Sequence, residues 1–192
     1  MRSDRLAGLE SYQRYALTGN GISPLAVPGE SKHLVVVDSD EHDEDGHIIE
    51  DSATRKKMVE KRLSRKIGRI QSAMAPPGFY GEENPETVLV AYGSTYGVLK
   101  EVTDMLADRH AIAMLHFSEV FPLPLPESFD YVSLLRNARN SICVELNATG
   151  QFARLLRAET GFVCTGQINR YDGRPFTADE LLEEVLVALK SA

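Results

Sequence analysis

A glycine turn between an apolar strand and an amphipathic helix most constrains what this chain can fold into. The apolar run at residues 87–91 stops just before Gly93, and a helical pattern begins directly afterwards. The apolar face of that pattern consists of Val98, Val102, Met105 and Leu106. Such a turn points backbone N–H groups out of a helix N-terminus, where the helix dipole favours an anion. It predicts an α/β fold and the sheet edge at which a site would form, but it names no reaction.

The composition is that of a globular domain and excludes several classes of protein. Hydrophobic residues make up 43% of the chain and the net charge is −7, which argues against general nucleic-acid binding. No stretch approaches the roughly 20 apolar residues of a membrane span. No apolar segment follows the charged residues 1–5, so we expect no secretory signal and a cytoplasmic location. Cys143 and Cys164 stand in apolar, strand-like runs, which predicts small buried thiols; two cysteines are too few for an iron–sulfur cluster.

The chain divides near residue 84. We expect residues 1–83 to form a connecting segment with a short strand at 33–37, an acidic loop at 38–51 and a basic helix behind it. The loop holds eight of the 28 acidic residues, and residues 55–69 hold eight of the 21 basic ones. The apolar face of the amphipathic helix is predicted to be Val59, Leu63, Ile67, Ile70 and Met74.

Residues 84–192 alternate strand and helix. Strands are predicted at 87–92, 112–117, 141–146 and 162–168. Helices are predicted at 98–108, 129–138 and 150–159, and a last helix opens at a capping box of Thr177 and Glu180. Strands separated by single helices predict a three-layer α/β domain, with a mostly parallel sheet and helices on both faces.

Polar groups follow three of the predicted strands, at the sheet edge where ligands of such folds gather. The candidates for an interface or an anion site are Gly93, Ser94, Thr95, Tyr96, His116, Asn147, Thr149 and Gln151. Hydroxyl and amide groups at helix N-termini suit a carboxylate or phosphate. The alternative, which we favour on chemistry alone, is that the glycines permit the turn and the polar side chains cap the helices.

The acidic run suggests a metal hypothesis. Asp40, His42, Asp43 and His47 offer oxygen and imidazole ligands, but their spacing matches no calcium loop and no His-Glu-x-x-His pattern. A solvated loop that pairs with the basic helix behind it is the favoured interpretation. A metal-dependent hydrolase stays open as an alternative.

Taken in order, the motifs of this chain resemble the alpha subunit of 2-oxoacid:ferredoxin oxidoreductases, and most of all the 2-oxoglutarate synthase type. The resemblance extends over nearly the whole chain from Tyr12. Its pieces are Arg14-Tyr15, residues 21–24, 38–48, 55–62, 93–97, 116–118, 147–153 and 171–176.

The resemblance implies oxidative decarboxylation of a 2-oxoacid on thiamine diphosphate. Electrons would pass through iron–sulfur clusters to ferredoxin, and CoA would take up the acyl group. The magnesium, thiamine diphosphate and clusters would belong to a beta subunit, so this chain alone is expected to bind no cofactor.

The family's pyrimidine-binding domain, with its Tyr-Pro-Ile-Thr-Pro motif, is absent from this sequence. The chain therefore resembles the second domain of the alpha subunit, similar to the carboxy-terminal domain of transketolase, with the segment that precedes it. It would be a truncated chain or the product of a split gene, with structural and interface roles and no catalytic residue. Its partners would be the missing amino-terminal alpha domain and the beta subunit, in an oligomer. The alternative is a free-standing anion- or phosphate-binding α/β module.

Overall fold

The computed structural model describes residues 6, 8–127 and 129–190. The chain forms two compact units, Met1–Ala73 and Met74–Ala192. The division lies earlier in the chain than the boundary expected between residues 83 and 84. The reason is a strand that the sequence analysis did not identify, β1 (Gly78–Gly81), which pairs with the sheet of the second unit.

The first unit is largely irregular apart from one helical segment. The segment consists of α1 (Ser52–Glu60), a π-helical turn, η2 (Lys61–Lys66), and α2 (Ile67–Gln71). Asp51 caps its start by accepting a 2.8 Å hydrogen bond from the Thr54 N–H. In the π turn the N–H of Ile67 donates to the carbonyl of Arg62, five residues earlier.

The predicted apolar face of this helix is wrong in part. Leu63 is 67% exposed, whereas Met58 and Lys61 are buried. A uniform α-helical period would have aligned Val59, Leu63 and Ile67, but the π turn changes the angular spacing of the side chains. The helical pattern therefore located the helix without locating its buried side.

The expected strand at residues 33–37 does not form. These residues have no strand partner among the described residues, and Leu34 and Val37 are exposed. Within the described residues, the isolated bridge outside the named strands joins His42 to Ile48, and the Asp38 N–H donates to the Gly46 carbonyl. Apolar residues in a row favour a strand only where a neighbouring strand supplies hydrogen bonds.

The second unit is built on a five-stranded sheet with the order β1-β3-β2-β4-β5. The other strands are β2 (Thr87–Tyr92), β3 (Ile112–Phe117), β4 (Asn140–Glu145) and β5 (Gly166–Asn169). These four strands run parallel, and β1 pairs antiparallel with β3 at one edge. The mostly parallel sheet predicted from the sequence is confirmed.

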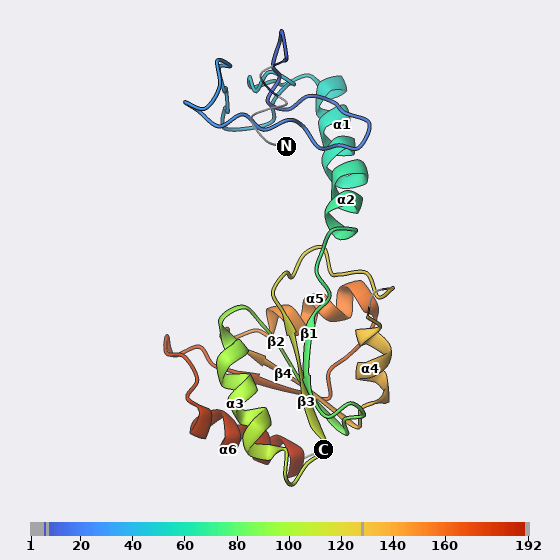
Figure 1. Ribbon diagram of the computed structural model, residues 1–192, viewed down its shortest axis with the longest axis vertical. Coiled ribbons are helices and arrows are strands. Elements are labelled where there is room, and N and C mark those ends of the chain that lie inside the picture. The colour runs from blue at the N-terminus through green and yellow to red at the C-terminus, as the bar shows by residue number, and fades with distance from the viewer. Residues whose placement is uncertain (1–5, 7, 128, 191–192) are drawn as a thin grey trace. The chain divides into compact units, whose positions relative to one another are not determined.

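Helices cover both faces of this sheet (Figure 1). A short 3-10 turn, η3 (Gly93–Thr95), leads into α3 (Tyr96–Leu106), which shares one face with α6 (Ala178–Lys190). The other face carries α4 (Tyr131–Asn137) and α5 (Gln151–Thr160). The three-layer α/β class is therefore confirmed.

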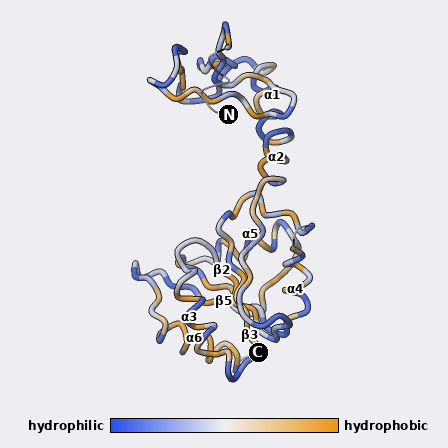
Figure 2. Tube along the Cα trace, in the orientation of Figure 1, coloured by the Kyte–Doolittle hydropathy of each residue, from blue (hydrophilic) through white to orange (hydrophobic). Residues whose placement is uncertain are grey.

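Alternation along β2 divides the core between the two faces. Leu89 and Ala91 pack with α3 and α6, whereas Val88 and Val90 pack with α4 and α5. Figure 2 shows the hydrophobic colouring concentrated along the strands of this sheet. A strand buried on both faces reads as a continuous apolar run, which is why the sequence located β2 and β3 so closely.

The last strand is shorter than predicted and lies later in the chain. β5 begins at Gly166, and the preceding residues 162–165 are outside the ladder. There Thr165 and Ser141 exchange side-chain and backbone hydrogen bonds, including a 2.8 Å bond from the Ser141 N–H to the Thr165 hydroxyl. Side-chain hydrogen bonds thus replace the backbone ladder over this stretch. Within the described residues, no helix has the length and apolar character needed to cross a bilayer.

Candidate functional site at the carboxyl edge of the sheet

The carboxyl ends of the four parallel strands lie at one edge of the sheet. The register pairs Tyr92 at the end of β2 with Phe117 at the end of β3, and Glu145 at the end of β4 with Asn169 at the end of β5. This edge is where open parallel sheets hold their ligands. It brings together the segments that the sequence analysis singled out after β2, β3 and β4.

The turn after β2 is organised by contacts within the chain. Gly93 has φ +65°, and its carbonyl lies 2.9 Å from Nε2 of the buried His116. The Thr95 hydroxyl donates to the Tyr92 carbonyl at 2.8 Å, so this hydroxyl supports the turn. Tyr96 is exposed, and its ring meets the His116 ring edge-on at 5.1 Å between centroids. The remaining polar group, Ser94, is exposed.

A buried carboxylate dominates the turn after β4. Glu145 is 0% exposed, yet four donors surround it. One of its oxygens accepts from the Phe152 N–H at 2.8 Å, and the other accepts from the Ala153 N–H at 2.9 Å. Asn147 Nδ2 donates at 2.7 Å and the Cys143 thiol at 3.3 Å. The desolvation of this charge is thus offset by charge-assisted hydrogen bonds from the first turn of α5.

The N-terminus of α5 is therefore occupied by the chain itself. Asn147 Oδ1 accepts hydrogen bonds from the N–H groups of Thr149 and Gln151, at 3.1 and 3.2 Å. Asn147 and Glu145 together accept hydrogen bonds from the backbone N–H groups that were expected to bind an external anion. Asn147 acts here as the capping residue of the alternative interpretation, while the side chains of Thr149 and Gln151 are exposed.

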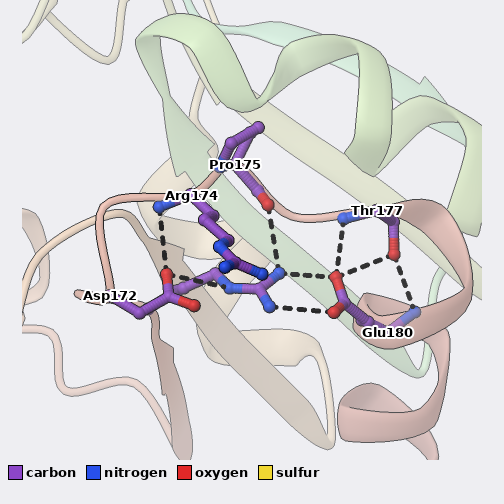
Figure 3. Close-up of polar contacts among 6 residues, drawn as sticks. Asp172, Arg174, Pro175, Thr177 and Glu180 are labelled. Atoms are coloured by element: carbon purple, nitrogen blue, oxygen red, sulfur yellow. Dashed lines mark hydrogen bonds and ion pairs between the residues drawn. The ribbon is translucent and has the colours of Figure 1, made fainter.

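A loop held by hydrogen bonds and ion pairs follows β5 at the same edge. The Arg170 N–H donates to the Glu145 carbonyl at 2.9 Å, and its guanidinium makes a two-pronged contact with Glu180, at 2.6 and 2.9 Å. Figure 3 shows Thr177 and Glu180 closing the predicted capping box, in which the Glu180 N–H donates to the Thr177 hydroxyl at 3.4 Å. Tyr171 projects from this loop and is 73% exposed.

We predict that Glu180 titrates far below an ordinary glutamate. The Arg170 guanidinium first, and then the Thr177 hydrogen bonds, lower the pKa of Glu180 from 4.5 to about 2. Because the folded pKa is lowered, the stabilisation is present above the unfolded pKa and is lost as the pH falls from there toward 2. The check is an NMR titration of the Glu180 carboxyl, in which Arg170→Gln should raise the midpoint toward 4.5. Arg174→Gln is the control, and a native midpoint near 4.5 contradicts the prediction.

Carboxylates of the acidic run accept hydrogen bonds from groups within the first unit. Asp43 Oδ1 accepts from the N–H groups of residues 45, 46 and 47, each at 3.0 Å. The Glu41 carboxylate accepts two hydrogen bonds from the Arg62 guanidinium, at 2.8 and 2.7 Å. One of its oxygens also lies 3.8 Å from a guanidinium nitrogen of Arg55. These hydrogen bonds, led by those from Arg62, lower the pKa of Glu41. The loop therefore pairs with the basic helix, and the described residues include no group of three or more metal-type ligands.

The two cysteines lie together beside Glu145. Both are free thiols; Cys143 is buried and Cys164 is half-buried. The neighbouring Cys164 sulfur, burial and the Glu145 carboxylate raise the pKa of Cys143. A thiol that donates to a carboxylate and stays protonated is not a nucleophile.

The sequence analysis missed the group that decides the chemistry of this edge. Glu145 was not among the candidate residues, although an acid that ends an apolar strand, shortly before a helix start, is a detectable signal. Asn169 was missed as well. Its Oδ1 atom is buried and has no hydrogen-bond partner among the described residues.

Comparisons with known proteins show what this architecture belongs to. No family model matches the chain. Subunit alpha of 2-oxoacid:ferredoxin oxidoreductase 1 from Sulfurisphaera tokodaii is 33% identical over 184 residues, 94% of this chain and 28% of that protein. Subunit alpha of 2-oxoacid:ferredoxin oxidoreductase 2 from Aeropyrum pernix is 33% identical over 176 residues, 88% of this chain and 26% of that protein.

A solved structure agrees with these relatives. It is the 2-oxoglutarate:ferredoxin oxidoreductase from Magnetococcus marinus with 2-oxoglutarate, coenzyme A and succinyl-CoA bound. It superposes with a TM-score of 0.71 at 27% identity, over 95% of this chain and 31% of that one. Fold and relatives together show that the chain is similar to part of a subunit of such enzymes. More closely, its similarity is to the alpha subunits of 2-oxoacid:ferredoxin oxidoreductases, and it spans about 28% of the length of the Sulfurisphaera tokodaii relative.

Proposed function

We propose that this chain is a structural segment of a thiamine diphosphate-dependent 2-oxoacid:ferredoxin oxidoreductase. The observation that carries the proposal is the similarity over 94% of this chain to 28% of an alpha subunit. The substrate is proposed to be 2-oxoglutarate, since a similar solved enzyme holds 2-oxoglutarate and succinyl-CoA. The reaction is the oxidative decarboxylation of that acid, with coenzyme A as acyl acceptor and ferredoxin as electron acceptor.

The chemistry is proposed to reside on other parts of the assembly. The described residues at the carboxyl edge do not fit a diphosphate, because Glu145 and Asn147 already take the N–H groups at the start of α5. Six of the eight acidic side chains of residues 38–51 likewise accept hydrogen bonds from donors of this chain; they are Asp38, Glu41, Asp43, Glu44, Asp45 and Asp51. No step of the reaction is therefore assigned to a residue of this segment.

The exposed part of the carboxyl edge supports an interface role. Tyr96 at the start of α3, Leu146 after β4 and Tyr171 after β5 are large, substantially exposed side chains. Aromatic residues of this kind are enriched where protein surfaces meet. The proposed partners are the remainder of the alpha subunit and a beta subunit that holds the thiamine diphosphate, magnesium and iron–sulfur clusters. Gly93–Tyr96, His116 and the turn at Asn147–Gln151 would then form an interface or the rim of a neighbouring site.

We predict no turnover by the isolated chain. The purified chain, supplied with 2-oxoglutarate, coenzyme A, thiamine diphosphate, magnesium and methyl viologen, should reduce no viologen above a heat-denatured control. Co-purification with the remaining alpha segment and the beta subunit should restore viologen reduction and succinyl-CoA formation. Steady reduction by the chain alone would exclude the proposal. If the complete assembly is inactive toward 2-oxoglutarate but active toward another 2-oxoacid, only the proposed substrate is excluded.

A further inference from the structure

A basic cavity of about 310 Å³ lies in the first unit. Residues of the irregular segment and of the helical segment line it together, all within Met1–Ala73. Its cationic lining consists of Arg14, Lys61, Arg62 and Lys66. No aspartate or glutamate is among the described residues that line it. A cavity with this charge balance attracts an anion.

Lys61 is the buried cation of this cavity. It is 5% exposed, and its ammonium donates hydrogen bonds to the Tyr15 carbonyl and the Ser23 hydroxyl, both at 2.5 Å. An ammonium group has three N–H donors, so these two acceptors leave one donor. The side chain is thus fixed in place with donor capacity left over.

The surrounding charges leave this lysine under-compensated. Burial, followed by the nearby positive charge of Lys66, lowers the pKa of Lys61 to about 8. Arg14 and Arg62 act in the same direction, and the Glu44 carboxylate opposes them. Glu44 is itself engaged, since it accepts a 2.6 Å hydrogen bond from the Leu17 N–H. Additional negative charge in the cavity would therefore stabilise the charged lysine.

Two further cations are available to a ligand. Arg62 is neutralised by its paired contact with Glu41. Within the described part of the chain, neither Arg14 nor Lys66 forms an ion pair. The Arg14 guanidinium lies over the Tyr15 ring, 4.9 Å from its centroid. The Tyr15 ring also stacks on the His42 ring, with 3.6 Å between the two centroids. Among the described residues, the cavity cations without an ion pair are thus Arg14, Lys61 and Lys66.

The π turn explains how these lysines come to share one cavity. Lys61 and Lys66 are five residues apart and would diverge on a regular α-helix. Backbone hydrogen bonds of a π turn span five residues, which brings such positions toward the same face. The opposite wall is held close by Gly21, with φ +75°, where a Cβ atom would lie 2.6 Å from the Lys66 nitrogen of the backbone.

We propose that this cavity binds the phosphate group of a small organic phosphate. The phosphate dianion would lie among Arg14, Lys61 and Lys66, which present charged donors. The volume lies near the lower end for small-molecule pockets and exceeds the space that one phosphate fills. Ile22, Leu25 and Met58 supply an apolar wall for the organic part.

Titration calorimetry of the full chain tests the proposal with phenyl phosphate as the probe. Phenyl phosphate should bind with a dissociation constant below about 1 mM and more tightly than inorganic phosphate, since only the ester contacts the apolar wall. Phenol, which lacks the phosphate, should not bind. Lys66→Ala and Arg14→Gln should each weaken binding about tenfold through the loss of one charged donor. Phosphorus NMR line broadening provides an independent readout.

The matched control is Lys57→Ala, an exposed lysine on the same helical segment that does not line the cavity. It should leave the affinity unchanged, and circular dichroism confirms that each variant is folded. Absence of phenyl phosphate binding overturns the proposal. Equal weakening by Lys57→Ala also overturns it, because it assigns the binding to general surface charge. If inorganic phosphate binds as tightly as phenyl phosphate, the proposed contact between the apolar wall and the organic group is overturned.

Discussion

Replacement of Glu145 with alanine should destabilise the second unit by about 2–6 kcal/mol. The substitution leaves the N–H groups of Phe152 and Ala153 buried without their acceptor, at about 1–3 kcal/mol for each such donor. It also removes the acceptor of the Asn147 side-chain amide, which organises the turn before α5. Since a whole domain is stable by only about 5–15 kcal/mol, this loss is a large part of the total. Urea denaturation followed by far-ultraviolet circular dichroism measures it.

Two further variants separate the carboxylate from the side-chain volume. Glu145→Gln keeps the shape but turns an NH₂ group toward donors, so it should fall between the native chain and Glu145→Ala. Glu159→Gln removes an exposed carboxylate from the same helix and should change the free energy of unfolding by less than about 0.5 kcal/mol. If Glu145→Ala behaves like Glu159→Gln, the carboxylate does not hold the N-terminus of α5.

Truncation of Phe117 to alanine should cost about 3–5 kcal/mol, the usual range for a fully buried aromatic residue. Phe117 is 1% exposed and ends β3 beneath the carboxyl edge. Its ring meets the Tyr131 ring edge-on at 5.3 Å and the Phe152 ring at 4.9 Å. The cavity left behind would lie between the sheet and the two helices, α4 and α5. Thermal and urea unfolding of the full chain measure the change.

An exposed aromatic residue gives the matched comparison. Tyr171→Ala removes a ring of similar size from the loop after β5, where it is 73% exposed. Its effect on unfolding should stay within about 0.5 kcal/mol. A similar loss for both variants would mean that the Phe117 ring contributes little through burial, contrary to the packing of this face.

The sheet was the most predictable part of the molecule. β3 begins and ends where the sequence analysis placed it, at Ile112 and Phe117, because strands buried on both faces leave an unbroken apolar run. The capping box at Thr177 and Glu180 was equally readable, since it depends on residues three positions apart. Both signals are local, and local signals survive in a single sequence.

What could not be predicted depends on contacts between distant residues. β1 consists of two aromatic residues between glycines, and only its pairing with β3 makes it a strand. The π turn at Lys61–Lys66 has no pattern of its own, and it turned Leu63 outward and Lys61 inward. At the carboxyl edge the sequence located the candidate residues, but Glu145 determines that the N-terminus of α5 is already filled.

The lengths of the strands have a consequence for aggregation of the chain. The two outermost strands, β1 and β5, have four residues each, whereas the three inner strands have six. At Gly81, with φ +115°, β1 leaves the extended conformation. Short, irregular borders offer few free backbone groups to a foreign strand, so they discourage aggregation through edge-to-edge pairing. The fold thereby limits edge-to-edge pairing between newly made copies of the chain.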